Sequence, residues 1–281
     1  MCPARWAPLV SPLIFLAWAA AGVGVGAYGT LVGAGGGFAL VPILLLVYPQ
    51  QSPAQLTAVS LAAVFANVTS GSIGYSRLRR IDYRTGLMLA PATIPGAVIG
   101  ALVVGAIPRA AFDAVMGSAL ILVSGFLLFK PRGSIPLGLG GRWVVSRTLV
   151  DSDGNRYQYR FNMALAILAS FGIGFVSSLL GIGGGIVQVP ILTTFFGFSA
   201  HIASATSQFV QVFTSGVGTV THIIHGDYAS FVGVTIALAV GVIIGAQAGT
   251  AISRRVAGNS IIRLLAVALG LVGIRLLLLR T

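Results

Sequence analysis

Apolar runs follow one another along almost the whole chain and are separated by short polar stretches. Eight runs have 19 to 24 residues, close to the roughly 20 that an α-helix needs to cross a bilayer. Two further runs, at 38–48 and 186–197, have 11 and 12 residues, or about 17 Å of helix against a hydrocarbon core of about 30 Å. The pattern predicts an all-α integral membrane protein with eight to ten membrane helices. Each short run is expected to be half a crossing, or a crossing completed by its neighbours. The eight long runs are 9–32, 54–76, 86–106, 109–129, 162–180, 201–224, 229–251 and 258–279.

Both short runs are part of matching glycine-rich sequences. Residues 33–44 read GAGGGFALVPIL, and residues 181–192, at an offset of 148, read GIGGGIVQVPIL. The match continues more loosely, with Ser60 aligned to Ser207 at an offset of 147. Chance is a poor explanation for this agreement. The sequence therefore predicts two copies of one five-segment membrane unit.

The arginines indicate that the two copies have opposite orientations in the membrane. The loop at 77–84 holds four arginines and its counterpart at 225–228 holds none, whereas the loop at 107–109 holds one and its counterpart holds Arg254 and Arg255. Cytoplasmic loops carry the positive excess in membrane proteins. The bias therefore predicts an inverted repeat with both termini outside, and five crossings per copy is the odd number that such a repeat requires.

Residues 130–161 form the only substantial hydrophilic stretch, between a first repeat at 1–129 and a second at 162–281. The letters RTLVDSDGNRYQYRF within it are typical of a strand, an Asp-Gly turn and a second strand. We expect a cytoplasmic linker that contains a β-hairpin. A regulatory docking role for this linker is an alternative, but no residue in it favours one.

Composition agrees with a lipid environment, since 56% of the residues are hydrophobic and 8% are charged, against roughly 25% charged in soluble domains. The net charge of +12 does not indicate a nucleic-acid partner, because the basic residues lie between apolar runs and form no stripe with aromatic side chains. The single cysteine, Cys2, excludes an intrachain disulfide and a multi-cysteine metal site. The first apolar run is too long for a signal-peptide core and is expected to be retained.

The two glycine clusters are the first candidate site. Glycine allows the chain to leave the helical conformation, and such irregular backbone is tolerated in a membrane only where protein or a water-filled cavity surrounds it. A helix that begins after the break presents free N–H groups and its positive dipole end, which together bind anions. Close helix packing by small residues is the alternative for each cluster taken alone. The glycines expected to contact a substrate are Gly35, Gly36, Gly37, Gly183, Gly184 and Gly185.

Polar side chains inside apolar runs are the second candidate, because each costs free energy there without a partner or a cavity. Ser207, Gln211 and Thr214 share one helical face by their spacing. Neutral amides and hydroxyls can donate hydrogen bonds to an oxyanion and still release it, although hydrogen bonding between helices explains any one of them about as well. The polar residues expected to contact a substrate are Ser60, Asn67, Gln188, Ser207, Gln208 and Gln211.

The distribution of acidic residues restricts the chemistry further. The chain has no glutamate, and its five aspartates lie near predicted helix ends or in the linker, which argues against a cation substrate and a carboxylate proton relay. His222 is then the candidate for any proton coupling. A metal site at His222, His225 and Asp227 is less favoured than an ordinary helix end. No phosphate-binding loop and no nucleophile–base pair is present, so we expect a protein without enzymatic activity, cofactor or metal.

These features together resemble the TauE/SafE family of sulfite and organosulfur-anion transporters. The resemblance covers nearly the whole chain and rests on the paired glycine-rich elements at 33–44 and 181–192, Ala-Thr-Ser at 205–207, Gly-Asp-Tyr at 226–228 and the two-copy layout. It implies transport of sulfite, sulfonates such as sulfoacetate, thiosulfate or related anions, often outward, across a prokaryotic inner membrane. The first copy departs from the second, because Leu40 stands where Gln188 stands, and the site is expected to be asymmetric.

The function expected from residues and resemblance together is secondary transport that exports sulfite or a small organosulfonate across the cytoplasmic membrane. An uptake permease for an anion such as thiosulfate, an anion channel and a membrane scaffold without transport are the alternatives. The expected partners are the anion and the lipid bilayer. A homodimer is left open.

Overall fold

The computed structural model describes residues 11–129 and 142–253, together with 266–267, 269–271, 273–275 and 277–278 near the C-terminus. The predictions that concern Cys2, the linker residues 130–141, Arg254, Arg255 and much of the run at 258–279 lie outside these residues.

Nine α-helices, a 3₁₀ turn and a β-hairpin are numbered in the described part of the chain, and the described residues between 266 and 278 are helical as well. The prediction of an all-α multi-pass membrane protein is therefore confirmed. The helices are α1 (Pro12–Val32), α2 (Gly37–Val47), α3 (Pro53–Arg77), α4 (Tyr83–Val103), α5 (Arg109–Leu128), α6 (Met163–Leu180), α7 (Gly185–Phe195), α8 (Ala200–His225) and α9 (Val232–Ile252), with the 3₁₀ turn η1 at Val104–Ala106 and the strands β1 (Val144–Val150) and β2 (Arg156–Asn162).

Six of these helices, α1, α3, α4, α5, α6 and α9, are long and apolar enough to cross a membrane. The short helices α2 and α7 have 11 residues each, about 17 Å at 1.5 Å per residue, so each reaches across only about half of the hydrocarbon core. Helix α8 has 26 residues but carries many polar side chains, which protein rather than lipid surrounds.

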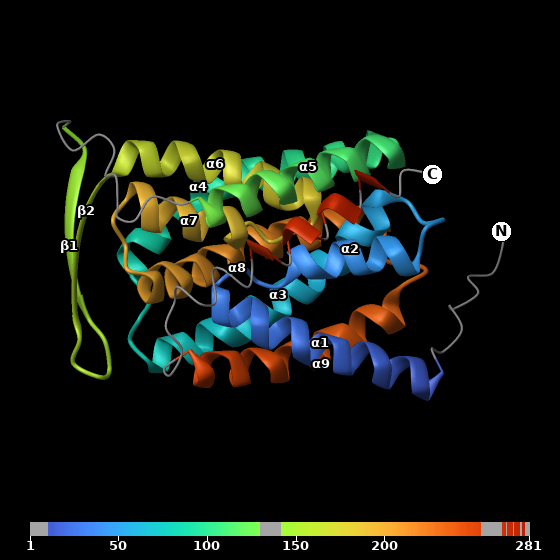
Figure 1. Ribbon diagram of the computed structural model, residues 1–281, viewed down its shortest axis with the longest axis horizontal. Coiled ribbons are helices and arrows are strands. Elements are labelled where there is room, and N and C mark those ends of the chain that lie inside the picture. Colours follow the sequence, from blue (N-terminus) through green and yellow to red (C-terminus); the bar gives the residue numbers. More distant parts are fainter. Residues whose placement is uncertain are drawn as a thin grey trace.

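The helices form an elongated bundle with the hairpin across one end and both termini at the other (Figure 1). Helix α1 runs from the end with the termini towards the hairpin, and α2 turns back; α6 and α7 do the reverse. The helix contacts show the same relation. In the predicted repeats α1 corresponds to α6 and α4 to α9, and α1 packs on α9 as α6 packs on α4. The inverted repeat stays a prediction, and these equivalent contacts support it.

Glycines let these helix pairs approach closely. A Cβ atom built on Gly241 of α9 would lie 2.1 Å from the carbonyl oxygen of Ala19 on α1, and one built on Gly96 of α4 would lie 2.2 Å from the carbonyl oxygen of Phe171 on α6. Small residues at such contacts let backbones pack directly against each other in membranes. Glycines at these crossings therefore serve packing.

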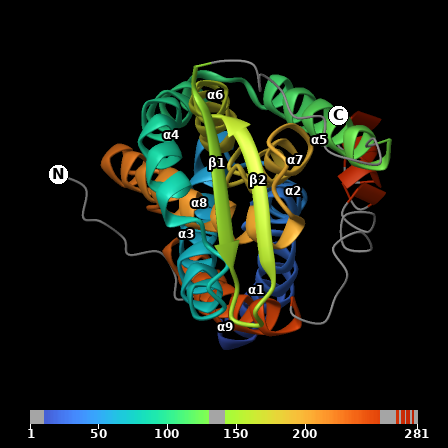
Figure 2. The ribbon, with the colours of Figure 1, turned by 90° about the vertical axis from the view of Figure 1, so that its left-hand side faces the viewer.

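The hairpin lies across the ends of the helices (Figure 2), and an ion-pair cluster attaches it there. Arg80 follows α3 and is only 3% exposed. Its guanidinium lies 3.3 Å from a carboxylate oxygen of Asp153 and 3.6 Å from one of Asp151. The backbone amide of Ser152 donates to the carbonyl of Leu78 at 3.1 Å. The hairpin is thus a docked element of the fold.

A second attachment joins the other strand of the hairpin to the start of α4. The hydroxyl of Tyr159 donates to Asp82 Oδ2 at 2.8 Å, and its ring packs on Phe198 with centroids 4.0 Å apart. Burial, reinforced by the Asp82 carboxylate, raises the pKa of Tyr159 above its ordinary value. Tyr159 therefore stays protonated and can continue to donate.

The pKa of Asp151, at the hairpin turn, is shifted in the opposite direction, downwards. Its burial alone would raise the pKa, but hydrogen bonds from Asn155, from the backbone amide of Asp153 and from Tyr157 outweigh that effect and hold the pKa below its usual range. Asp151 is therefore a carboxylate at neutral pH, as an ion pair with Arg80 requires.

Candidate functional site

The two glycine-rich sequences interrupt the helices in the same way. Gly35 and Gly36 have φ angles of 71° and 85°, and α2 begins at the next residue; Gly183 and Gly184 have φ angles of 79° and 83°, and α7 begins at the next residue. Only glycine adopts these left-handed angles readily. Neither short helix has a side-chain cap on its first N–H groups, which an α-helix cannot satisfy internally. Each short helix therefore starts with backbone N–H groups that no side chain caps.

The two breaks are in contact with each other. A Cβ atom on Gly37 would lie 2.5 Å from the carbonyl oxygen of Gly181, and one on Gly185 would lie 2.3 Å from the carbonyl oxygen of Gly33. From this point α2 extends towards the end with the termini and α7 towards the hairpin (Figure 1). Their N-terminal ends converge at the middle of the bundle, where both dipoles present their positive ends.

The polar residues that the sequence singles out lie around this point, and three of them donate to carbonyl oxygens of the breaks. Asn67 Nδ2 donates to the Gly35 carbonyl at 3.0 Å and Ser60 Oγ to the Gly181 carbonyl at 2.7 Å. Gln211 Nε2 donates to the Gly33 carbonyl at 2.9 Å. These three side chains therefore hold the breaks in shape, and the donors named here are occupied.

Gln188, Ser207 and Gln211 form one network between α7 and α8. Gln211 Nε2 donates to Ser207 Oγ at 3.0 Å, and Ser207 Oγ donates to Gln188 Oε1 at 3.1 Å. The network leaves two buried atoms without a partner among the described residues, the donor Gln188 Nε2 and the acceptor Gln211 Oε1. Both atoms are available to a ligand.

Gln208 is completely buried, and neither atom of its amide has a hydrogen-bond partner in the described part of the chain. Its side chain lies against Gly71 of α3, where a Cβ atom would clash with Oε1. An unsatisfied amide inside a membrane bundle is costly and is more readily explained by a ligand than by packing. Gln208 is thus a second source of a free donor, beside Gly71 of α3.

Sequence reasoning did not single out Thr30 or Val64. Thr30 Oγ1 donates to Asn67 Oδ1 at 3.1 Å, which orients the amide that holds Gly35. Val64 has the place in α3 that Gln211 has in α8, at the same offset of 147 that relates Ser60 to Ser207. The alignment of the two repeats could therefore have identified Val64. Thr30, near the end of its helix, has no comparable signal in the sequence.

His222 lies near the opposite end of α8 from the hairpin. Its Nδ1 is 2.6 Å from Asp227 Oδ2, its side chain is 1% exposed, and its Nε2 has no partner among the described residues. The structure therefore separates His222 from the breaks and pairs it with a carboxylate. No group of three or more His, Cys, Asp or Glu side chains that could hold a metal is found in the searched part of the chain.

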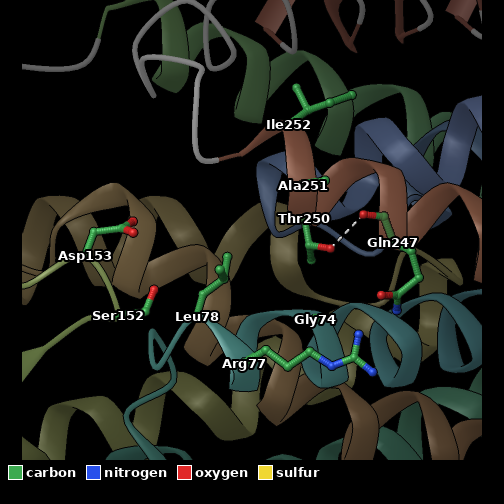
Figure 3. A pocket seen from close by; sticks show the side chains of 9 residues that line it. All are labelled: Gly74, Arg77, Leu78, Ser152, Asp153, Gln247, Thr250, Ala251 and Ile252. Carbon is green, nitrogen blue, oxygen red and sulfur yellow. Dashed lines mark hydrogen bonds between the residues drawn. The ribbon is translucent and has the colours of Figure 1, made fainter.

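A cavity of about 980 Å³ opens at the hairpin end, between the end of α3, the hairpin turn and the end of α9. Figure 3 shows Ser152 and Asp153 on one side of it and Gln247 and Thr250 on the other, with Arg77 beside Gly74. It lies at the end that carries most of the described arginines, the end predicted to be cytoplasmic. The lining residues are Gly74, Arg77, Leu78, Ser152, Asp153, Gln247, Thr250, Ala251 and Ile252.

Comparison with known proteins agrees with this architecture. The family model for sulfite exporter TauE/SafE matches residues 18–276. The chain belongs to this TauE/SafE family. It is similar to the probable membrane transporter protein YunE of Bacillus subtilis, with 30% identity over 266 residues that cover 91% of this chain and 94% of the relative.

A second relative is the probable membrane transporter protein MJ0441 of Methanocaldococcus jannaschii, which is 25% identical over 282 residues that cover 96% of each chain. No solved structure matches the chain. The resemblance inferred from the glycine-rich motifs is confirmed, and this TauE/SafE protein is a multi-pass membrane transporter.

Proposed function

We propose that this transporter exports sulfite or a small organosulfonate such as sulfoacetate across the cytoplasmic membrane. The observation that carries the proposal is the meeting of two uncapped helix N-termini, at Gly37 and Gly185, in the middle of the bundle. The description of the family as sulfite exporters supports the substrate class. The names of the two relatives say only that they are probable membrane transporters.

The proposed site binds an anion without a cationic side chain. The two helix dipoles and the free backbone N–H groups attract negative charge, and Gln188 Nε2 and Gln208 Nε2 add neutral donors that have no other partner among the described residues. A buried arginine or lysine would bind an anion more tightly and slow its departure. Neutral donors suit a carrier, which has to release its substrate in every cycle.

Alternating access follows from the same contact between the breaks. The two breaks lie directly against each other, so a bound anion requires them to separate. Rocking of one inverted repeat against the other around a central site is the usual way to achieve this. The inside-negative potential favours departure of an anion by about 2.3 kcal/mol per charge per 100 mV, so export needs no coupling ion.

The test is flux in proteoliposomes that contain the purified protein, with sulfite, sulfoacetate, thiosulfate and sulfate as substrates. An imposed potential and, separately, a pH gradient supply the driving force, and protein-free liposomes are the control. Saturable flux of a sulfur anion that follows the potential supports the exporter. Absence of flux for all four anions would refute it. Unchanged transport and affinity in both Ser207→Ala and Gln211→Ala would refute the site.

Proton-coupled uptake of an anion such as thiosulfate is a second candidate, which the pairing of His222 with Asp227 favours. In that case His222 would carry the proton, and its Nε2 is the atom left to exchange it. Flux driven by a pH gradient at zero potential distinguishes this candidate from the exporter. Unitary currents without saturation would instead indicate an anion channel.

A further inference from the structure

The side-chain amide of Gln211 is fixed in one orientation at the point where the two breaks meet. Its Nε2 donates both to the Gly33 carbonyl at 2.9 Å and to Ser207 Oγ at 3.0 Å. In the reverse orientation Oε1 would face the Gly33 carbonyl, and two acceptors would stand together with no proton between them. The hydrogen bonds therefore determine where Oε1 points.

Gln211 Oε1 points between the two breaks. A methyl group built on Gly35 would lie 2.7 Å from it, and one built on Gly183 would lie 3.1 Å from it. The residue is 1% exposed, and this oxygen has no partner in the described part of the chain. A buried acceptor without a donor costs free energy, and such atoms occur where a ligand completes the bonding.

The first repeat provides no matching acceptor. Val64 has the equivalent place, and its Cγ1 would lie 3.0 Å from a methyl group on Gly35 and 2.5 Å from one on Gly183. The central point thus has one free acceptor from α8 and an apolar wall from α3. One donor on the substrate is enough to satisfy it.

We propose that Gln211 Oε1 selects a protonated monoanion, hydrogensulfite, over anions of similar shape that carry no O–H group. The inference rests on the proposed function and, of its two substrate classes, assigns this site to sulfite rather than to organosulfonates. Hydrogensulfite donates its proton to Oε1, while its remaining oxygens accept from the uncapped amides of α2 and α7. Sulfite dianion, sulfate and sulfonates present only acceptors, which Oε1 repels. A buried site built around a substrate hydrogen bond rejects the analogue that lacks it.

Each neighbour that the structure places against the Gln211 amide is uncharged. They are Gly33, Gly35, Gly183, Gly185 and Ser207. His222 is 11 positions further along α8, about 17 Å at the helical rise. Protonation of the substrate, rather than of the protein beside it, thus decides the interaction.

The test compares sulfite with methanesulfinate in proteoliposomes at mildly acidic pH, where hydrogensulfite predominates. Methanesulfinate has the same charge and the same pyramidal sulfur, and it carries a methyl group in place of the hydroxyl. We expect its flux, and its ability to compete with sulfite, to be at least about tenfold weaker. Equal flux of both anions would overturn the selection by Oε1 and leave the exporter standing. Flux of neither anion would overturn this inference; the exporter would fall with it only if sulfoacetate, thiosulfate and sulfate also showed no flux.

The variant Gln211→Met keeps the length of the side chain and removes both amide atoms. We expect it to bring the ratio of the sulfite flux to the flux of the analogue without a hydroxyl group towards one. Gln247→Met is the matched control, because Gln247 lies on α9 and donates to Ser70 outside the breaks, and it should keep the wild-type ratio. A Gln211→Met protein that folds and keeps that ratio refutes the role of Oε1. If it does not fold, the wild-type ratio decides.

Discussion

Replacement of Gly185 by alanine measures how tightly the two glycine breaks are packed. Gly185 is the first residue of α7 and does not have a positive φ angle, so alanine meets no conformational penalty there. The added methyl group would lie 2.3 Å from the Gly33 carbonyl oxygen and 2.3 Å from Gln211 Nε2. Both distances are far inside van der Waals contact, and one of the two atoms belongs to the backbone.

Overpacking of this kind costs about 1–3 kcal/mol. At roughly 2–4 °C per kcal/mol, the apparent Tm of the purified protein in detergent should fall by about 2–12 °C. Thermal unfolding followed by tryptophan fluorescence measures the change, and flux of the proteoliposome substrates should fall with it, because the methyl group displaces Gln211 from the Gly33 carbonyl.

Gly172→Ala on α6 is the matched control. A Cβ atom at Gly172 meets nothing within 4 Å, so alanine should leave stability unchanged or raise it by up to about 1 kcal/mol through its better helix propensity. If Gly185→Ala were as stable and as active as Gly172→Ala, the close contact between the breaks would be wrong.

Three further changes test the centre and the hairpin. Asn67→Asp places a carboxylate against the Gly35 carbonyl and into the proposed anion site, so flux should fall at least about tenfold through charge repulsion, and undiminished flux contradicts the site. Arg80→Ala leaves Asp151 buried without its cation, at a cost of about 3–5 kcal/mol; limited proteolysis should then cut the hairpin faster than in the exposed control Arg84→Ala, and equal rates contradict the docking. Because the pKa of Tyr159 is raised in the fold, its hydrogen bond stabilises the hairpin fully below the ordinary tyrosine pKa of 10.0 and is lost as the pH rises above it. Tyr159→Phe should therefore flatten the decline of stability at alkaline pH, and an unchanged decline contradicts this assignment.

Most of the fold follows from the sequence because hydropathy and length largely determine which segments can cross a bilayer. The apolar run at 201–224 corresponds to α8, although α8 is not among the helices apolar enough to span a membrane alone. The docking of the hairpin could not be predicted in the same way. Arg80 is one of several arginines in its loop, and only the folded chain brings Asp151 and Asp153 to it.

Some residues of the candidate site could be singled out from the sequence, but their hydrogen bonds could not be predicted. Polar side chains within apolar runs identified Ser60, Asn67 and Gln211, because such residues need partners in a membrane. Their donors face the carbonyls of the glycine breaks, and which carbonyls need a donor depends on the left-handed turns. Val64 could not be identified in this way, because it is an apolar residue within an apolar run.

The polarity of α8 also has a consequence for biosynthesis. Its buried face carries Ser207, Gln208, Gln211, Thr214 and Ser215, so the segment would partition poorly into lipid when it leaves the translocon alone. Helix α3, which packs against it, is synthesised much earlier and is already in the bilayer. We therefore expect integration of the second half of the chain to depend on prior insertion of the first.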